Sequence, residues 1–137
     1  AILEGKSIDI YNYGKMKRDF TYVDDIVEGI TRLIPTVPVP DKNWNGLTPD
    51  PASSFAPYRI YNIGNNQPVE LMAFVEAIEE KLGIKANKNL LPLQEGDVPE
   101  TYADVQALMD AVDFKPNTSI KQGISNFIDW YKTYYNI

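Results

Sequence analysis

The stretch SIDIYNYGKMKRDFTYVDDIVEGITRLI, residues 7–34, decides the fold because the spacing of its apolar side chains changes part-way along. Over Ser7–Tyr13, β-branched and aromatic residues alternate with polar ones and stop at Gly14, which predicts a short strand. From Asp24, which is in place to cap a first turn, apolar residues recur on one helical face until Pro35. This half of the stretch therefore predicts a helix.

The remaining sequence continues this mixed pattern. Residues 35–57 are rich in proline, aspartate, asparagine and serine, which predicts a long, mobile surface loop. Tyr58–Ile63 predicts a second strand, and Asn89–Leu93 is a short apolar segment that suits a third. Apolar faces at helical spacing predict three more helices, beginning near Pro68, Asp104 and Thr118.

Together these elements predict a small α+β domain with about four helices and two or three short strands. So few strands do not make a self-sufficient sheet, because their apolar faces need another layer to cover them. We therefore interpret residues 1–137 as one domain of a larger protein, from which the covering domain is missing. Apolar surface left uncovered in this way is expected to drive self-association.

Composition limits the classes of function. The chain has 13 basic and 19 acidic residues, a formal charge of -6, and neither histidine nor cysteine. The negative charge disfavours nucleic acid and membrane surfaces as partners, and the two missing residue types remove thiolate nucleophiles and the usual zinc ligands, so no metal site is expected. No apolar stretch approaches the roughly 20 residues that span a bilayer, and no signal-peptide pattern opens the chain. A cytoplasmic protein is expected.

Two Tyr-x-x-x-Lys matches, Tyr11 to Lys15 and Tyr13 to Lys17, have the spacing that hydride-transfer enzymes use to place a lysine beside a proton-donating tyrosine. That chemistry needs a helix to align positions four residues apart, whereas these matches straddle a strand end and Gly14. We interpret both as chance matches and expect no catalytic residue in this chain.

Two further clusters each have a functional and a structural interpretation. Asp24 and Asp25 could act as a paired acid and base, but capping and the helix dipole account for them without chemistry. The second cluster could be a stacking platform, although core and rim packing is the interpretation we favour. It consists of the C-terminal aromatic residues Trp130, Tyr131, Tyr134 and Tyr135.

Lys15, Lys17 and Arg18 form the only basic cluster of an acidic chain, which fits either a phosphate clamp or a solvated loop. The turn that contains Asn65 and Asn66 lacks the further glycines of a dinucleotide-binding fingerprint. These two asparagines either touch a phosphate group or only form the turn before the next helix.

Four groups of residues, in this order along the chain, carry a family pattern: Gly14–Ile26, Tyr61–Asn65, Gln94–Pro99 with Ala103-Asp104, and Phe114–Pro116 followed by Trp130-Tyr131. Together they resemble the C-terminal part of nucleotide-sugar epimerases of the extended short-chain dehydrogenase/reductase family. The likeness covers essentially the whole chain. The sequence KMKRDFTY and the LPLQ stretch before Glu95 make the resemblance strongest to the branch that acts on UDP-glucuronate.

The resemblance implies a parent enzyme whose N-terminal Rossmann domain holds NAD and a Ser/Thr, Tyr and Lys catalytic set, none of which lies in these residues. Such an enzyme transiently oxidises C4 of the sugar, rotates the 4-keto intermediate and returns the hydride to the other face. What this chain resembles is the domain that binds the UDP-sugar. The isolated chain is therefore expected to be inactive and to bind no cofactor.

The family's pattern also implies roles for individual residues. Arg18 would bind the diphosphate, which suits a guanidinium because its fork can bond two phosphate oxygens. Tyr11 and the backbone near Asp9 would border the uracil, and Asp97 would accept hydrogen bonds from the ribose hydroxyls. Gln94 stands where many relatives have a second arginine, so it can hydrogen-bond but brings no charge.

Two other hypotheses stay open at this point: a stand-alone binding or interaction module that has lost catalysis, and an oligomerisation domain built on the aromatic C-terminal helix. A module that lives alone should carry polar residues where another domain once docked. The predicted strands instead keep Ile8, Ile10, Ile60 and Ile63, which favours the fragment of an epimerase.

Overall fold

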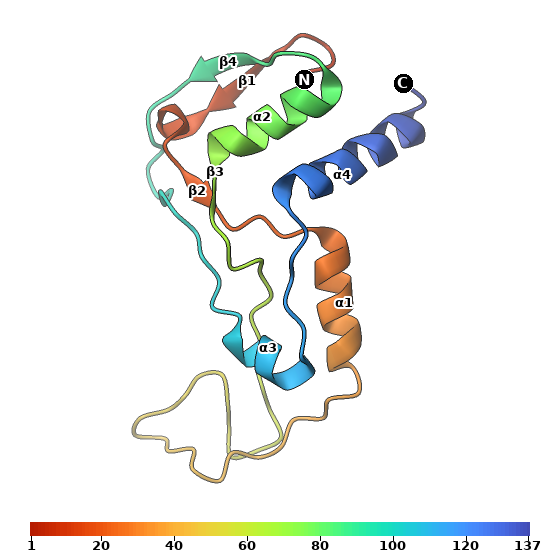
Figure 1. Ribbon diagram of the computed structural model, residues 1–137. Coiled ribbons are helices and arrows are strands. Elements are labelled where there is room, and N and C mark those ends of the chain that lie inside the picture. Colours follow the sequence, from red (N-terminus) through yellow and green to blue (C-terminus); the bar gives the residue numbers. More distant parts are fainter.

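The computed structural model describes residues 1–137 and contains four α-helices, four very short strands and one 3-10 turn. Figure 1 shows two groups of elements joined by extended segments: β1, β4, α2 and α4 in one, α1 and α3 in the other. This is the small α+β arrangement that the sequence predicts. The bounds are β1 Ser7–Ile10, η1 Tyr11–Gly14, β2 Lys17–Arg18, α1 Val23–Leu33, β3 Val69–Glu70, α2 Leu71–Leu82, β4 Asn87–Leu90, α3 Gln106–Val112 and α4 Ile120–Tyr135.

The strands form two separate pairs. β1 runs parallel to β4, with Ser7 opposite Asn87 and Ile10 opposite Leu90, although the two strands lie far apart in the sequence. β2 pairs antiparallel with β3, which precedes α2 directly. Each pair has only two strands, so neither is a sheet that could stand without helices packed against it.

Packing of α2 against α4 makes the main hydrophobic core. Ala77, Ile124 and Ile128 are buried there, and Phe74 and Ile78 pack around them. A second small core forms at the other end of the molecule, where Leu108, Val105 and Pro116 are fully buried. Only 16 of 137 residues are buried in all, so a large share of the apolar side chains is left on the surface.

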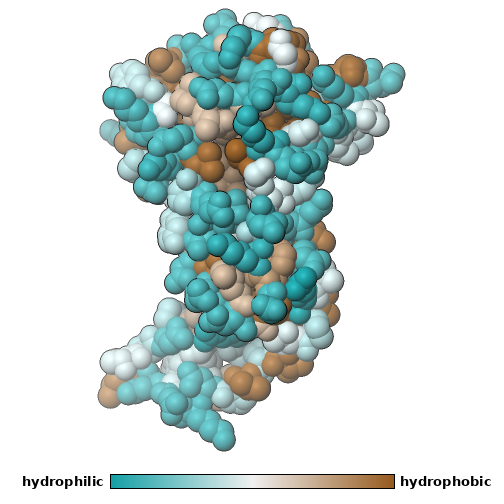
Figure 2. Space-filling model, viewed as in Figure 1, coloured by the Kyte–Doolittle hydropathy of each residue, from teal (hydrophilic) through white to brown (hydrophobic).

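The α1 helix shows this exposure most clearly. The sequence predicts an inward apolar face, yet Val27, Ile30 and Ile34 are all exposed, because no element packs over that face of the helix. Figure 2 shows apolar surface lying among polar residues on the narrow lower part of the molecule. No helix of the chain has the length and apolar character needed to cross a membrane.

Three predicted elements differ from the structure. The strand Tyr58–Ile63 is wrong, because only Arg59 forms an isolated bridge, to Ser53, and no neighbouring strand exists for the rest. The strand Ser7–Tyr13 ends at Ile10, since Asn12 and Tyr13 adopt left-handed φ values of 50° and 51°. The helix expected from Pro68 begins at Leu71 instead, because the residues before it pair with β2.

The capping interpretation of Asp24 is also wrong in part. α1 begins after Tyr22, and no side chain caps it, although Asp24 and Asp25 do lie in the first turn, where the helix dipole favours an acid. The predicted start of α4 is confirmed, since the Ser119 hydroxyl caps that helix by accepting from the Gln122 N–H at 3.2 Å.

Residues 35–57 contain no helix or strand, which confirms the predicted loop, and their mobility stays a prediction. The loop is held by its own contacts. The ring of Trp44 lies 5.6 Å from that of Phe55, and its indole N–H donates to the Asp50 carbonyl at 3.1 Å. The Asp41 carboxylate accepts from the buried Ser53 hydroxyl at 3.0 Å.

The Asp19 carboxylate joins three parts of the chain directly beyond the short pairing of β2 with β3. Its Oδ2 accepts backbone N–H groups from Asn66 at 3.1 Å and Ala103 at 3.2 Å, and its Oδ1 accepts from Gln67 at 3.2 Å. A Cβ atom added to Gly64 would lie 2.5 Å from the Ala103 Cβ and 2.9 Å from Asp19 Oδ2. Glycine is therefore required at 64 for the three segments to meet this closely.

Replacing the Asp19 carboxylate should loosen this junction. In Asp19→Asn, the amide oxygen could accept only two of the three N–H groups and the amide NH₂ would oppose the third, so we expect a loss of about 2 kcal/mol in the free energy of unfolding. Urea denaturation measures this loss. Asp24→Asn is the matched control, since Asp24 is exposed and should change stability by only a few tenths of a kcal/mol. Equal stability of the two variants would contradict the role of Asp19.

The buried carboxylate of Glu79 fixes β4 to the end of α2. Gly83 closes the helix with a left-handed φ of 70°, and the chain then turns back over Glu79. The Glu79 carboxylate accepts from Lys85 Nζ at 2.7 Å, from Lys88 Nζ, and from the Ala86 N–H at 2.9 Å. These bonds, that of Lys85 foremost, lower the pKa of Glu79 from 4.5 to about 2.

This lowered pKa makes the free energy of unfolding depend on pH in the acidic range. Since the folded pKa lies below the ordinary value, Glu79 stabilises the fold above about pH 4.5, and the contribution is lost as the pH falls towards 2. Glu79→Gln should lower the urea midpoint at pH 7 and reduce its change between pH 5 and about 3. Glu76→Gln, on the exposed side of the same helix, should keep the wild-type pH dependence. A wild-type pH profile in Glu79→Gln would refute this assignment.

Candidate functional site

The carboxyl ends of the parallel strands β1 and β4 meet at one edge, and the segments that follow them run side by side. The Leu91 N–H donates to the Ile10 carbonyl and the Tyr13 N–H donates to the Leu91 carbonyl, both at 2.9 Å. Further on, the Lys17 N–H donates to the Pro99 carbonyl at 2.8 Å. The loop after β4 thus lies against the segment that contains Lys15, Lys17 and Arg18. This place is beyond the carboxyl ends of the two parallel strands, where α/β proteins commonly bind ligands.

Two residues to which the family pattern gives binding roles, Arg18 and Asp97, lie in direct contact at this place. Arg18 Nη2 is 3.0 Å from Asp97 Oδ1. The guanidinium is oriented further by Nη1, which donates to the Lys17 carbonyl at 2.8 Å and to the Pro99 carbonyl at 3.3 Å. Both side chains are partly buried, with 24% of the arginine and 32% of the aspartate exposed, so each still reaches solvent.

The Arg18–Asp97 pair has capacity left for a ligand. Asp97 Oδ1 takes both the arginine bond and the Val98 N–H at 2.9 Å, so Oδ2 remains to accept from another donor. A guanidinium has five N–H donors in a rigid fork. In Arg18, Nη1 donates to the Lys17 and Pro99 carbonyls and Nη2 donates to Asp97 and, at 3.9 Å, to Met16 Sδ, so Nε–H alone has no partner. An anion approaching from solvent can use Nε–H and can replace the long bond to Met16 Sδ.

Gln94 belongs to the same loop. Its carbonyl accepts from the Asp97 N–H at 3.2 Å, and Gly96 allows the turn with a φ of 82°. The Gln94 side chain is exposed beside the pair. The tertiary structure thus brings Arg18 against a loop that carries both Gln94 and Asp97.

Asp9 and Tyr11 lie along β1 and η1, and no hydrogen bond or ion pair joins them to the Arg18–Asp97 pair. Asp9 is exposed, and its Oδ1 accepts from the side chain of Asn89, which is opposite it on β4, at 2.9 Å. Tyr11 is half-buried at the start of η1, at the same edge of the strand pair.

The two lysines beside Arg18 have different surroundings. Lys17 Nζ is 3.6 Å from Glu70 Oε1, so part of its charge is compensated within the chain. Lys15 is exposed and makes none of the ion pairs in the structure. Left-handed φ values inside η1 also separate this segment from the regular helix that a catalytic Tyr-x-x-x-Lys motif requires.

The turn next to Asp19 contains an anomaly. The side-chain oxygens of Asn65 and Asn66 are buried and have no hydrogen-bond partner. Asn66 also has a left-handed φ of 55°, which supports its interpretation as a turn residue. The turn alone does not explain the two unpaired amide oxygens, which call for a donor rather than for a phosphate oxygen.

Sequence reasoning missed or misjudged several other residues. The sequence does not identify Asp19 as the acceptor that joins three segments, because a single acid in a polar stretch cannot be distinguished from a solvated residue. Asp25 was assigned to the helix start, yet it is buried and its Oδ2 accepts the Thr118 N–H at 3.0 Å, which joins α1 to the start of α4.

The interpretation of the aromatic cluster as packed is wrong for Trp130, Tyr134 and Tyr135, which are all exposed. Trp130 stacks on Tyr134 with ring centroids 5.3 Å apart, and Tyr131 lies 4.6 Å from Tyr135. The opposite face of α4 is already covered by α2, and nothing packs on the aromatic face.

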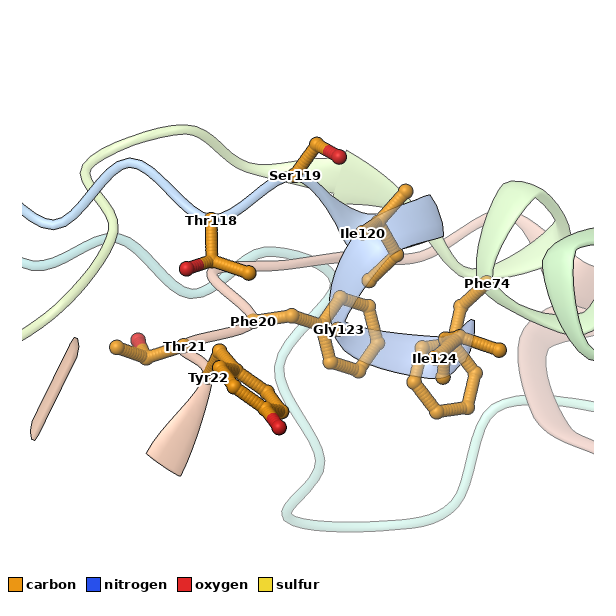
Figure 3. Close-up of a pocket in the computed structure, with 9 residues that line it drawn as sticks. All are labelled: Phe20, Thr21, Tyr22, Phe74, Thr118, Ser119, Ile120, Gly123 and Ile124. Carbon is orange, nitrogen blue, oxygen red and sulfur yellow. The ribbon is translucent and has the colours of Figure 1, made fainter. Parts of the chain in front are cut away.

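A small cavity of about 100 Å³ lies between the segment before α1 and the start of α4. In Figure 3, Phe20 and Phe74 bound it on one side and Thr118 and Ile120 on another. The two phenylalanine rings are stacked 4.4 Å apart. Ligand pockets usually have about 300 Å³ or more, so this cavity is a packing gap between elements.

Comparison with known proteins gives the family. The model of the NAD dependent epimerase/dehydratase family matches residues 1–70, which is just over half of the 137 residues. Protein CapI of Staphylococcus aureus is 60% identical over 98% of this chain and 40% of its own length. A probable UDP-glucuronate 4-epimerase of Rhizobium meliloti is 46% identical, again over 98% of this chain and 40% of the relative.

Solved structures agree with these relatives. UDP-glucuronic acid 4-epimerase from Bacillus cereus, in complex with UDP-glucuronic acid and NAD, aligns with a TM-score of 0.74 and 27% identity. The alignment covers 97% of this chain and 37% of that protein. The chain therefore spans about two fifths of the length of the relatives that it matches. Its family model, relatives and fold agree, and the chain belongs to the NAD dependent epimerase/dehydratase family.

Proposed function

We propose that residues 1–137 form the part of a nucleotide-sugar epimerase that binds the UDP-sugar. The parent would interconvert UDP-glucuronate and UDP-galacturonate through a 4-keto sugar. The observation that carries this proposal is the contact of Arg18 with Asp97, which pairs a phosphate-binding group with a hydroxyl-binding group at a strand edge. The R. meliloti relative and the B. cereus structure, both described as UDP-glucuronate epimerases, support the choice of sugar.

In this proposal the diphosphate binds Arg18. The carbonyls of Lys17 and Pro99 already orient the guanidinium, so little side-chain entropy is lost when two phosphate oxygens bind its fork. Lys15 adds positive charge at the rim. Local charge matters here, because the chain as a whole carries -6 and would otherwise repel a nucleotide diphosphate.

The nucleoside lies on the other side of the arginine in this arrangement. Asp97 accepts from the ribose hydroxyls through Oδ2, while Gln94 supplies a neutral hydrogen-bonding group in the same turn. Tyr11 offers a ring on which uracil can stack, and backbone groups near Asp9 border the base edge. The sugar would then extend away from this chain.

NAD and the catalytic residues are assigned to a Rossmann domain outside these residues. The parallel pair β1–β4 lacks the strand–turn–helix with a glycine fingerprint that holds a dinucleotide, because β1 leads into η1 and β4 into a long loop. The residues present thus do not fit the cofactor. The role of this chain is to bind and orient, and the isolated chain should have no epimerase activity.

An amide-shift NMR titration tests the binding role. UDP and UDP-glucuronate should each shift amides near Tyr11, Arg18 and Asp97, and NAD should leave these amides unchanged. Arg18→Ala should weaken UDP binding by roughly tenfold or more, because a charge-assisted bidentate contact is lost. Affinity for UDP is expected to be weak, since one side of the ligand would remain in water.

Arg59→Ala is the matched control. Arg59 pairs with Asp50 in the proline-rich loop, so its loss removes the same charge at another place and should leave UDP binding intact. If a folded wild-type chain shows no shift with any UDP compound, the site assignment is refuted, and a protein-interaction module becomes the better hypothesis. If both arginine variants lost the same UDP affinity, the loss would be explained by net charge and not by a contact of Arg18 with the diphosphate.

A further inference from the structure

Asn45 is the only asparagine of the chain that is followed by a glycine. Both residues are exposed in the proline-rich loop of residues 35–57, and the next residue, Leu47, is 91% exposed. Figure 1 shows that this loop extends away from the helices, so water reaches the dipeptide. The backbone nitrogen that follows an asparagine can attack its side-chain amide, and a side chain on the following residue hinders the attack. Glycine removes that hindrance.

The turn at this place does not need a glycine. Gly46 is not among the residues with a left-handed φ, and a Cβ atom added to it would lie 3.7 Å from the Trp44 ring, an ordinary van der Waals distance. At Gly64, by contrast, an added Cβ would lie 2.5 Å from the Ala103 Cβ. Position 46 can therefore take an alanine without strain, and such a change alters the reactivity of the dipeptide without disturbing the fold.

The groups around Asn45 favour attack on its side chain. The Leu47 N–H donates to Asn45 Oδ1 at 3.0 Å, which folds the side chain back over the peptide bond to Gly46. The same donor can stabilise the negative charge that develops on Oδ1 when the amide carbon is attacked. The Thr48 N–H donates to the Asn45 carbonyl at 3.1 Å and closes the turn. The Gly46 N–H makes none of the backbone hydrogen bonds, so it is free to lose its proton to hydroxide.

We propose that Asn45 is a site of spontaneous deamidation through a succinimide. The deprotonated Gly46 nitrogen attacks Cγ of Asn45 and forms a C–N bond, and Nδ2 takes up a proton and leaves as ammonia. Water then opens the resulting ring at either of its carbonyls, which gives aspartate or isoaspartate. One water molecule is consumed, one ammonia molecule is released, and nothing is oxidised or reduced.

The isoaspartate product should change the conformation of the loop. Its main chain runs through Cβ and Cγ, so the turn that ends at Thr48 becomes longer by one methylene group. The preceding residue, Trp44, depends on this turn, because its indole N–H donates to the Asp50 carbonyl at 3.1 Å. The new carboxylate also adds negative charge beside Asp41 and Asp50 in the same loop. We therefore expect Trp44 to move into water as the chain ages.

The reaction is independent of nucleotide-sugar binding. The Arg18–Asp97 pair lies outside the proline-rich loop, and no hydrogen bond or ion pair joins the pair to Asn45. The deamidation and the proposed binding role can therefore fail separately. A chain that deamidates at Asn45 and binds no UDP would refute only the binding role.

The test ages the purified chain in neutral buffer and follows its tryptic peptides by mass spectrometry. Cleavage after Lys42 and Arg59 gives one peptide that contains both Asn43 and Asn45. Asn45 should become a mixture of aspartate and isoaspartate, faster in mildly alkaline than in mildly acidic buffer, because the attacking nitrogen must lose its proton. Asn43 is the internal control, since it is equally exposed but is followed by Trp44, and it should keep its amide.

Two substitutions show whether the dipeptide carries the reaction. Gly46→Ala should keep the melting temperature of the wild type and slow the conversion by about tenfold, since the added methyl group hinders the attacking nitrogen. Asn43→Gln is the matched control in the same loop and should leave the rate at Asn45 unchanged. The tryptophan emission of the aged wild type should shift to the red, and that of Gly46→Ala aged for the same time should shift far less.

Three results would overturn the proposal. Equal conversion of Asn43 and Asn45 would show that exposure alone sets the rate. A wild-type rate in folded Gly46→Ala would remove the role of the glycine. A product with aspartate but no isoaspartate would show direct hydrolysis of the amide in place of a succinimide.

Discussion

The structure depends on the carboxylate of Asp19. It accepts three backbone N–H groups, from Asn66, Gln67 and Ala103, directly beyond the two-residue pairing of β2 with β3. The two strand pairs are too short to fix the long connections between the helices. The Asp19 carboxylate fixes these connections at one point, because it accepts from three N–H donors. The close approach of Gly64 leaves the carboxylate no room to shift.

The candidate site is held by this same junction. Arg18 immediately precedes Asp19, and the loop that carries Asp97 runs through Pro99 to Thr101, whose hydroxyl accepts the Asp19 N–H at 3.3 Å. The Asp19 backbone N–H, together with the carboxylate bond to the Ala103 N–H, therefore ties the segment of Arg18 to the loop of Asp97. Ion pairs near a surface contribute little stability on their own, so this pair matters mainly for the binding role that we propose for it.

The rest of the surface is unusually apolar for its size. Three apolar surfaces are incompletely covered: the exposed apolar face of α1, the aromatic face of α4, and a groove lined by the N-terminal turn, β1, α2 and α4. Because apolar side chains are spread over several faces, fewer remain for one continuous interior, and the core is divided into two small parts.

Local sequence was enough to identify the helices, the long loop and the Ser119 cap, because helical periodicity and capping depend on residues within a few positions of one another. The residues of the candidate site were chosen from a family pattern. Only the tertiary structure brought Arg18 to Asp97, paired β1 with β4, removed the strand expected at Tyr58–Ile63 and gave Asp19 its role. Each of these outcomes depends on partners tens of residues away, and the spacing of side chains along one segment carries no information about them.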